Sequence, residues 1–248
     1  MSKQPKISII NPEKESVFPN KLPMWTGRNV LFIATAVLMA LTLYMIFMWV
    51  PTEQNLGISQ RIFYLHVPLA WLGMLSIVLV AFSSAMHLIT QSEHWDNIGY
   101  VIAELGMVFI TLLLITGIMW SKPVWGVWWT WDARLTTTAV LWFIYVGYLM
   151  LRAYGPGGSQ GARYGAVVAL IGAIDAPIIY MATVWWRTAH PDMNIGPLAE
   201  PGGLDPNMQL TLWISTLTFT TLYIYLGMER YSLKRAEVAV DRLFHHAT

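Results

Sequence analysis

The residues of this chain that could do chemistry are concentrated between positions 120 and 136, in the segment WSKPVWGVWWTWDARLT. Five of the chain's 13 tryptophans lie here, and the charged pair Asp132 and Arg134 follows them. The five are Trp120, Trp125, Trp128, Trp129 and Trp131. Tryptophan is enriched where a membrane meets water, but one or two rings are enough to anchor a helix end. Five rings so close together favour a platform for a large, planar, apolar ligand.

The backbone conformation of this segment decides which rings lie together. If it is helical, Trp125, Trp128 and Trp129 share one face with the acid that follows them. If it is extended, Trp125, Trp129 and Trp131 align instead. Both conformations place an acid and a base at the edge of an aromatic surface. We interpret Asp132 as orienting the neighbouring arginine or the loop backbone rather than touching a ligand.

Two of the six histidines fall at the same predicted level as the tryptophans. His66 occurs in RIFYLHVPLAW and His190 in VWWRTAHPDM. Neutral imidazole is the commonest metal ligand and an axial ligand of haem iron. One such histidine at a membrane interface is usually structural, but two beside five tryptophans favour ligation. We therefore expect His66 and His190 to hold the iron of a planar macrocycle between them.

Arginines accompany both histidines. Arg61 precedes His66 by five residues, Arg187 precedes His190 by three, and Arg134 follows the tryptophans. Haem carries two propionates, and arginine pairs with carboxylates through two parallel hydrogen bonds. These three arginines are candidates for propionate pairing, with ordinary anchoring at the interface as the alternative.

Composition indicates that membrane helices position these residues. The chain has 248 residues, of which 56% are hydrophobic and 12% charged, and its mean hydropathy is +0.50. A soluble domain carries roughly twice that share of charge. Cysteine is absent from the sequence, which excludes disulfides, thiolate metal sites and self-attached c-type haem. No P-loop motif occurs either, so ATP binding of that kind is excluded.

We predict an all-α integral membrane protein with six transmembrane helices. The apolar runs occupy about residues 30–50, 62–90, 98–120, 136–151, 164–185 and 208–228, within a membrane domain of residues 29–229. Residues 1–28 are a polar N-terminal segment without a recognisable signal peptide, and residues 230–248 are a basic tail. The tryptophan-rich loop, residues 120–136, joins the third and fourth spans.

Positive charge predicts the orientation of these spans. The two termini and the even-numbered loops together hold 11 of the 15 Lys and Arg residues. The positive-inside rule therefore places both termini in the cytoplasm, and the tryptophan-rich loop on the outer face. Two acids, Glu104 and Asp175, fall inside predicted spans, where a carboxyl group is a functional group, is protonated, or is bonded between helices.

The segment WGVWWTWDARLT resembles the "WWD" signature of the haem-handling proteins of cytochrome c biogenesis, and the contexts YLHVP and VWWRTAH match as well. In size, span number and orientation the chain is most similar to the haem exporter protein C family (cytochrome c maturation protein C, CcmC) of System I. The resemblance runs from the first span to the sixth. It implies a multi-pass protein of the cytoplasmic (inner) membrane that binds haem b on its periplasmic side. His66 and His190 would be the axial ligands, and the five tryptophans with Asp132 the platform.

The resemblance also implies partners. They are the haem chaperone CcmE, which receives the haem, the ABC transporter subunits CcmA and CcmB, and the small membrane protein CcmD; no nucleic acid is implied. The chain would then be a haem-transfer subunit rather than an enzyme, and not itself an ATPase. The alternatives are a b-type electron-transfer protein with permanent haem, or a small-molecule transporter that uses Glu104 and Asp175. Neither alternative explains the tryptophan-rich segment.

Overall fold

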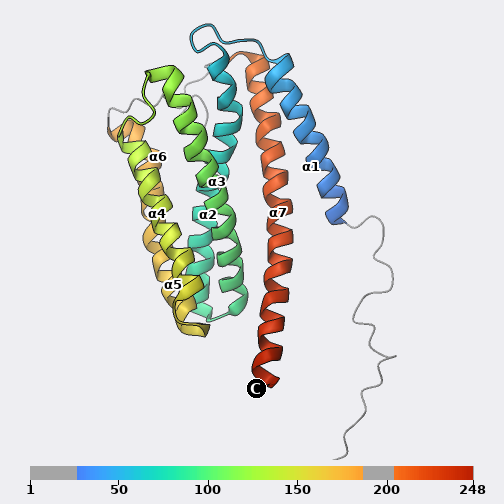
Figure 1. Cartoon of the computed structure of the whole chain (residues 1–248), viewed down its shortest axis with the longest axis vertical. Coiled ribbons are helices and arrows are strands. Elements are labelled where there is room, and N and C mark those ends of the chain that lie inside the picture. Colours follow the sequence, from blue (N-terminus) through green and yellow to red (C-terminus); the bar gives the residue numbers. More distant parts are fainter. Residues whose placement is uncertain (1–26, 187–203, 248) are drawn as a thin grey trace, which may run out of the picture.

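The computed structural model describes residues 27–186 and 204–247, and this part of the chain consists of helices and their connections, without a β-strand. Six of its helical stretches are long and apolar enough to cross a membrane (Figure 1). The prediction of an all-α membrane protein with six transmembrane helices is thereby confirmed. Two of the predicted site residues, Arg187 and His190, lie outside the described residues.

Three helices, α3, α4 and α7, are longer than the apolar runs that predict them. The elements are α1 (Gly27–Tyr44), η1 (Met45–Trp49), η2 (Ile58–Ile62), α2 (Phe63–Thr90), α3 (Glu93–Trp125), α4 (Ala133–Tyr154), α5 (Gly158–Ala173), α6 (Asp175–Trp185) and α7 (Pro206–Ala247). The last predicted span ends at residue 228, whereas α7 continues to Ala247. Hydropathy marks where the apolar environment stops, and a helix continues through polar residues when their backbone bonds remain satisfied.

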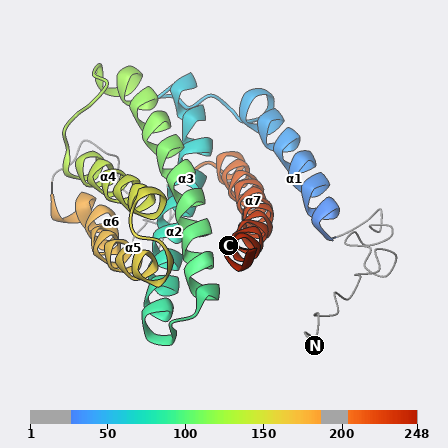
Figure 2. The ribbon, with the colours of Figure 1, turned by 60° about the horizontal axis from the view of Figure 1, so that its bottom comes forward.

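The helices pack around a central antiparallel pair, α2 and α3. α7 packs against both of them and carries α1 on its outer side, while α4, α5 and α6 cover the opposite side (Figures 1 and 2). α2 and α3 approach each other closely through small residues, as membrane helices commonly do. At Gly106 a Cβ atom would lie 2.7 Å from Ser76 Cβ, so only glycine fits there.

Polar side chains join α7 to its neighbours. Ser76 and Tyr223 share a hydrogen bond of 2.8 Å between α2 and α7, and Thr42 and Thr218 share one of 2.7 Å between α1 and α7. Because lipid offers no hydrophobic driving force between helices, such bonds and close packing hold the spans together.

The two intramembrane acids differ in their surroundings. Glu104 on α3 forms an ion pair with Arg230 on α7, with 2.6 Å between Oε2 and Nε. Of the interpretations that the sequence leaves open for Glu104, the structure therefore shows the bond between helices. Asp175 begins α6, and its Oδ2 is buried without a hydrogen-bond partner among the described residues.

The connections gather at two ends of the molecule. Figure 1 shows that the link from α1 to α2, the link from α3 to α4, the end of α6 and the start of α7 lie at one end. We call it the platform end, because it contains the tryptophan-rich segment. The link from α2 to α3, the link from α4 to α5 and the C-terminal part of α7 lie at the opposite end.

Candidate functional site

The tryptophan-rich segment is part helix and part loop. α3 continues through Trp125, and Gly126, with φ of +77°, closes it in the left-handed conformation that glycine adopts most readily. Since α4 begins at Ala133, the non-helical connection is residues 126–132, shorter than the predicted loop of residues 120–136. Neither a continuous helix nor a continuous strand therefore describes the segment.

Its rings pair edge to face. The Trp120 and Trp125 rings have centroids 5.3 Å apart, and the Trp129 and Trp131 rings 5.9 Å apart, each pair at 77°. The side chains of Trp128 and Trp131 are 56% and 79% exposed, whereas the other three rings are half-buried. Trp120, Trp125, Trp128, Trp129 and Trp131 together form a surface that we call the aromatic platform. Its two exposed rings offer apolar area to a ligand.

Two indole N–H groups of the platform are buried without a partner. Nε1 of Trp120 and Nε1 of Trp129 have no hydrogen-bond acceptor in the part of the chain that the structure describes. A buried donor without an acceptor costs about 1–3 kcal/mol. Such donors therefore suit a site where a ligand with acceptor atoms completes the bonding.

Asp132 holds the loop next to the platform. Its Oδ1 accepts hydrogen bonds from the backbone N–H groups of Arg134, at 2.9 Å, and Leu135, at 3.1 Å, which makes it the N-cap of α4. Its Oδ2 accepts from the Thr130 hydroxyl at 2.5 Å. The preceding residue, Trp131, has φ of +55°, a conformation that is rare for a bulky side chain. The carboxylate thus fixes the backbone on both sides of the turn.

His66 lies on α2 and contacts α3 about one helical turn before the platform residue Trp120. Its Nδ1 is 2.9 Å from the hydroxyl oxygen of Thr116 on α3. Thr116 and Trp120 are four residues apart on α3 and so share a face. A Cβ atom at Gly117 would lie 3.2 Å from His66 Cε1, so glycine there leaves room for the imidazole. Nothing in the spacing of the sequence indicates Thr116 or Gly117, since only the packing of α2 on α3 brings them to His66.

The candidate arginines differ in their surroundings. Arg61, in η2, donates from Nη1 to the backbone oxygen of Phe47 at 2.9 Å, and its Nε is buried without a partner among the described residues. Arg134 is half-buried in the first turn of α4. Lys122, by contrast, donates to the backbone oxygen of Gly126 at 2.7 Å and so closes the end of α3. The propionate-pairing role of Arg61 and Arg134 stays a prediction.

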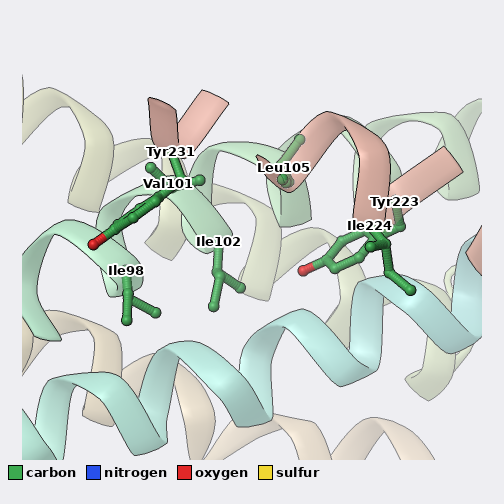
Figure 3. A pocket seen from close by; sticks show the side chains of 8 residues that line it. Ile98, Val101, Ile102, Leu105, Tyr223, Ile224 and Tyr231 are labelled. Atoms are coloured by element: carbon green, nitrogen blue, oxygen red, sulfur yellow. The ribbon is translucent and has the colours of Figure 1, made fainter. Parts of the chain in front are cut away.

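A groove elsewhere on the molecule contains none of these residues. It lies between α3 and α7, has a volume of about 200 Å³ and is almost wholly apolar (Figure 3). Val101 and Leu105 line it from α3, and Ile224 and Gly227 from α7. Tyr223 and Tyr231 also line it, but their hydroxyls bond to Ser76 and His94, whereas most small-molecule sites have polar groups placed to fix the orientation of the ligand. The aromatic platform with His66 is therefore the better candidate site.

Comparisons with known proteins identify the family of the chain. Residues 11–243 match the sequence profile of the family described as Heme exporter protein C. The chain is 31% identical to Heme exporter protein C of Bradyrhizobium diazoefficiens over 222 residues, which cover 90% of this chain and 82% of that protein. It is 34% identical to Heme exporter protein C of Escherichia coli strain K12 over 214 residues, 86% of each chain. It is also 35% identical over 158 residues (64% of this chain and 67% of the other) to a putative cytochrome c biosynthesis ccmC-like mitochondrial protein of Marchantia polymorpha. A match over most of the chain shows the family, so this membrane protein belongs to the heme exporter protein C family of cytochrome c biogenesis.

Proposed function

We propose that this protein binds haem b at the platform end and delivers it to the haem chaperone CcmE for maturation of c-type cytochromes. The platform end would face the periplasm across the cytoplasmic (inner) membrane. The observation that carries the proposal is the position of His66, which lies against α3 one helical turn before Trp120, at the edge of the aromatic platform. This arrangement supports a planar ligand that needs both an imidazole and a broad apolar surface.

The residues present fit a haem. The exposed rings of Trp128 and Trp131 would bury their apolar area against the macrocycle. His66 and His190 would ligate its iron, and Arg61, Arg134 and Arg187 are the candidates to pair with its propionates. The buried N–H groups of Trp120 and Trp129 are further donors that lack acceptors in the described part of the chain. Haem is the transported ligand here, and the chain supplies its binding site.

Delivery requires that this binding site release the haem. A haem held by two strong histidine ligands would resist transfer, so one ligand must exchange with a residue of the chaperone during handover. The chain lacks a P-loop, so the energy for any ATP-driven step would come from the partners CcmA and CcmB, with CcmD in the same complex. The protein would thus act as a transfer subunit and not as an enzyme.

Optical spectra of the purified protein test this proposal. We expect the wild type to take up haem, the variants His66→Ala and His190→Ala to show an altered haem spectrum, and wild-type haem to pass to CcmE on mixing. His94→Ala is the matched control, because His94 bonds to Tyr231 at the opposite end of the molecule, with 2.8 Å from Nδ1 to the hydroxyl. Either site variant binding haem and loading the chaperone like the wild type would refute the ligand assignment. Stable haem that cycles between redox states without transfer would indicate an electron-transfer cytochrome instead.

A further inference from the structure

The contacts of the Thr116 hydroxyl bear on which nitrogen of His66 carries the proton. The Thr116 hydroxyl oxygen lies 2.8 Å from the backbone oxygen of Leu112 and 3.0 Å from that of Leu113. Both carbonyls can only accept, and a hydroxyl has a single proton to donate. When that proton goes to the carbonyls, the oxygen faces His66 Nδ1 with a lone pair. Nδ1 must then be the donor.

α3 contains a second threonine in the same arrangement, and there the direction is unambiguous. Thr111 Oγ1 lies 2.7 Å from the backbone oxygen of Met107 and 2.9 Å from Trp142 Nε1. An indole nitrogen can only donate, so Thr111 accepts from the ring while it donates to the helix backbone. Thr116 has the same two kinds of neighbour, one turn and a half further along α3.

Gly117 sets how closely the imidazole approaches. A Cβ atom at this position would lie 3.2 Å from His66 Cε1 and 3.9 Å from Nδ1. The first distance is shorter than ordinary van der Waals contact, so an alanine here would push the ring away by a few tenths of an ångström. Thr116 and Gly117 therefore hold the His66 ring together: Thr116 supplies the hydrogen-bond acceptor, and Gly117 leaves the space beside it.

We propose that Thr116 is a positioning residue that holds His66 as the Nδ1–H tautomer and so presents the lone pair of Nε2 as the atom that ligates haem iron. Metal-binding histidines usually donate their second N–H to a partner that fixes the tautomer and the ring orientation. A carboxylate partner would raise the basicity of the ligand strongly, whereas a neutral hydroxyl raises it less. The choice of threonine suits a haem that must leave again. The inference rests on the proposed function for its ligand.

The tautomer itself can be measured without haem. The full-length protein is prepared with 15N-labelled histidine, and the signals of His66 are identified by their loss in His66→Ala. Spectra are taken at a pH of about 8, where histidine is neutral. We expect Nδ1 to be protonated in the wild type and in Thr116→Ser, and the preference to be lost in Thr116→Val. A wild-type His66 protonated on Nε2, or a tautomer unchanged in Thr116→Val, would overturn the proposal.

Haem titration then tests the consequence. Thr116→Val is expected to weaken haem binding by about 10- to 100-fold and to shift the iron–histidine stretching frequency of the ferrous protein, and Thr116→Ser to restore both. Thr111→Val is the matched control, since it removes the hydroxyl that serves Trp142 and should leave both readouts unchanged. If the wild type binds no haem, the proposed function fails while the tautomer result stands. If Thr116→Val binds haem with unchanged affinity and frequency, Thr116 has no positioning role.

Discussion

At the scale of single residues, Trp131 combines an unfavourable backbone with an exposed side chain. Its φ of +55° lies in the left-handed region, which costs an L-residue roughly 1–2 kcal/mol. Its ring is 79% exposed and pairs edge to face only with Trp129 among the described residues, so little burial compensates that cost. Strain of this kind persists where surrounding structure fixes it, as at ligand sites. Here the residue that follows Trp131 is Asp132, which is itself held in place as the N-cap of α4.

Glycine and alanine at position 131 separate the two effects. The free energy of unfolding of Trp131→Gly should be about 1 kcal/mol higher than that of Trp131→Ala, so the glycine variant is the more stable one. Glycine adopts this conformation without the steric cost. Both variants should bind haem more weakly than the wild type, because both lose the exposed ring. Denaturant unfolding in detergent and haem titration measure the two quantities. Equal stability of the two variants would contradict a left-handed residue at this position.

Asp132 permits a test of what a carboxylate does beside the platform. If it acts as the N-cap of α4, Asp132→Asn keeps the cap and should retain haem affinity, whereas Asp132→Ala should lose about 1 kcal/mol of unfolding free energy and part of that affinity. If instead its negative charge acted on the ligand, the asparagine variant would lose affinity as fully as the alanine variant. Haem titration of both variants beside the wild type distinguishes these results.

At the scale of the elements, alanine substitutions at three glycines distinguish residues that serve helix packing from residues that position His66. Gly106→Ala should lower the free energy of unfolding by about 1–3 kcal/mol, because its Cβ would meet Ser76 Cβ at 2.7 Å in the contact between α2 and α3. Gly117→Ala should mainly shift the haem spectrum, since its Cβ would meet the movable imidazole ring. Gly147→Ala in α4 is the control, because its Cβ would have no neighbour within 4 Å. Thermal unfolding and haem spectra of the three variants check this order, which an unfolding loss in Gly147→Ala would contradict.

The elements also show what the sequence could and could not predict. Hydropathy identifies the six spans because each is a run of apolar residues, and each run is a local property of the chain. The predicted loop starts at residue 120, yet α3 continues through Trp125 and is closed at Gly126, whose backbone oxygen accepts a hydrogen bond from Lys122. The contact between His66 and Thr116 joins residues 50 positions apart, and sequence spacing carries no signal for it. The histidine type and the tryptophan cluster predict a candidate site, but only packing reveals what orients it.

At the scale of the whole molecule, two ion pairs between helices lie toward the end opposite the platform. Glu104 pairs with Arg230 between α3 and α7, and Asp96 pairs with Arg152 between α3 and α4, each with a closest distance of 2.6 Å. Both pairs are mostly buried. Because Glu104 has a structural partner, the transporter alternative loses one of the two acids on which it rests.

Neutralising Glu104 should therefore affect stability and not haem binding. Glu104→Gln removes one of the two carboxylates that pair with the Arg230 guanidinium, the other being Glu237 at 3.0 Å, and should lower the free energy of unfolding by about 1–3 kcal/mol. Haem affinity should stay at the wild-type value, because the pair lies away from the platform end. The exchange variant Glu104→Arg with Arg230→Glu should recover part of the lost stability. A loss of haem transfer in Glu104→Gln at unchanged stability would show that the acid has a functional role.

The orientation of the molecule in the membrane decides whether haem can be delivered outside the cytoplasm. The sequence contains no cysteine, so a single introduced cysteine is the only thiol. Val127, in the connection from α3 to α4, is 47% exposed, and Tyr154, at the far end of α4, is 86% exposed. From the distribution of Lys and Arg we expect Val127→Cys to react with a membrane-impermeant maleimide from the periplasmic side, and Tyr154→Cys only after the membrane is opened. The reverse pattern would place the aromatic platform in the cytoplasm, where a periplasmic chaperone could not receive haem from it. Labelling of both positions before the membrane is opened would show that the membrane preparation is leaky, so Tyr154→Cys is the internal control for membrane integrity. The parent protein, which has no cysteine, should not be labelled at all.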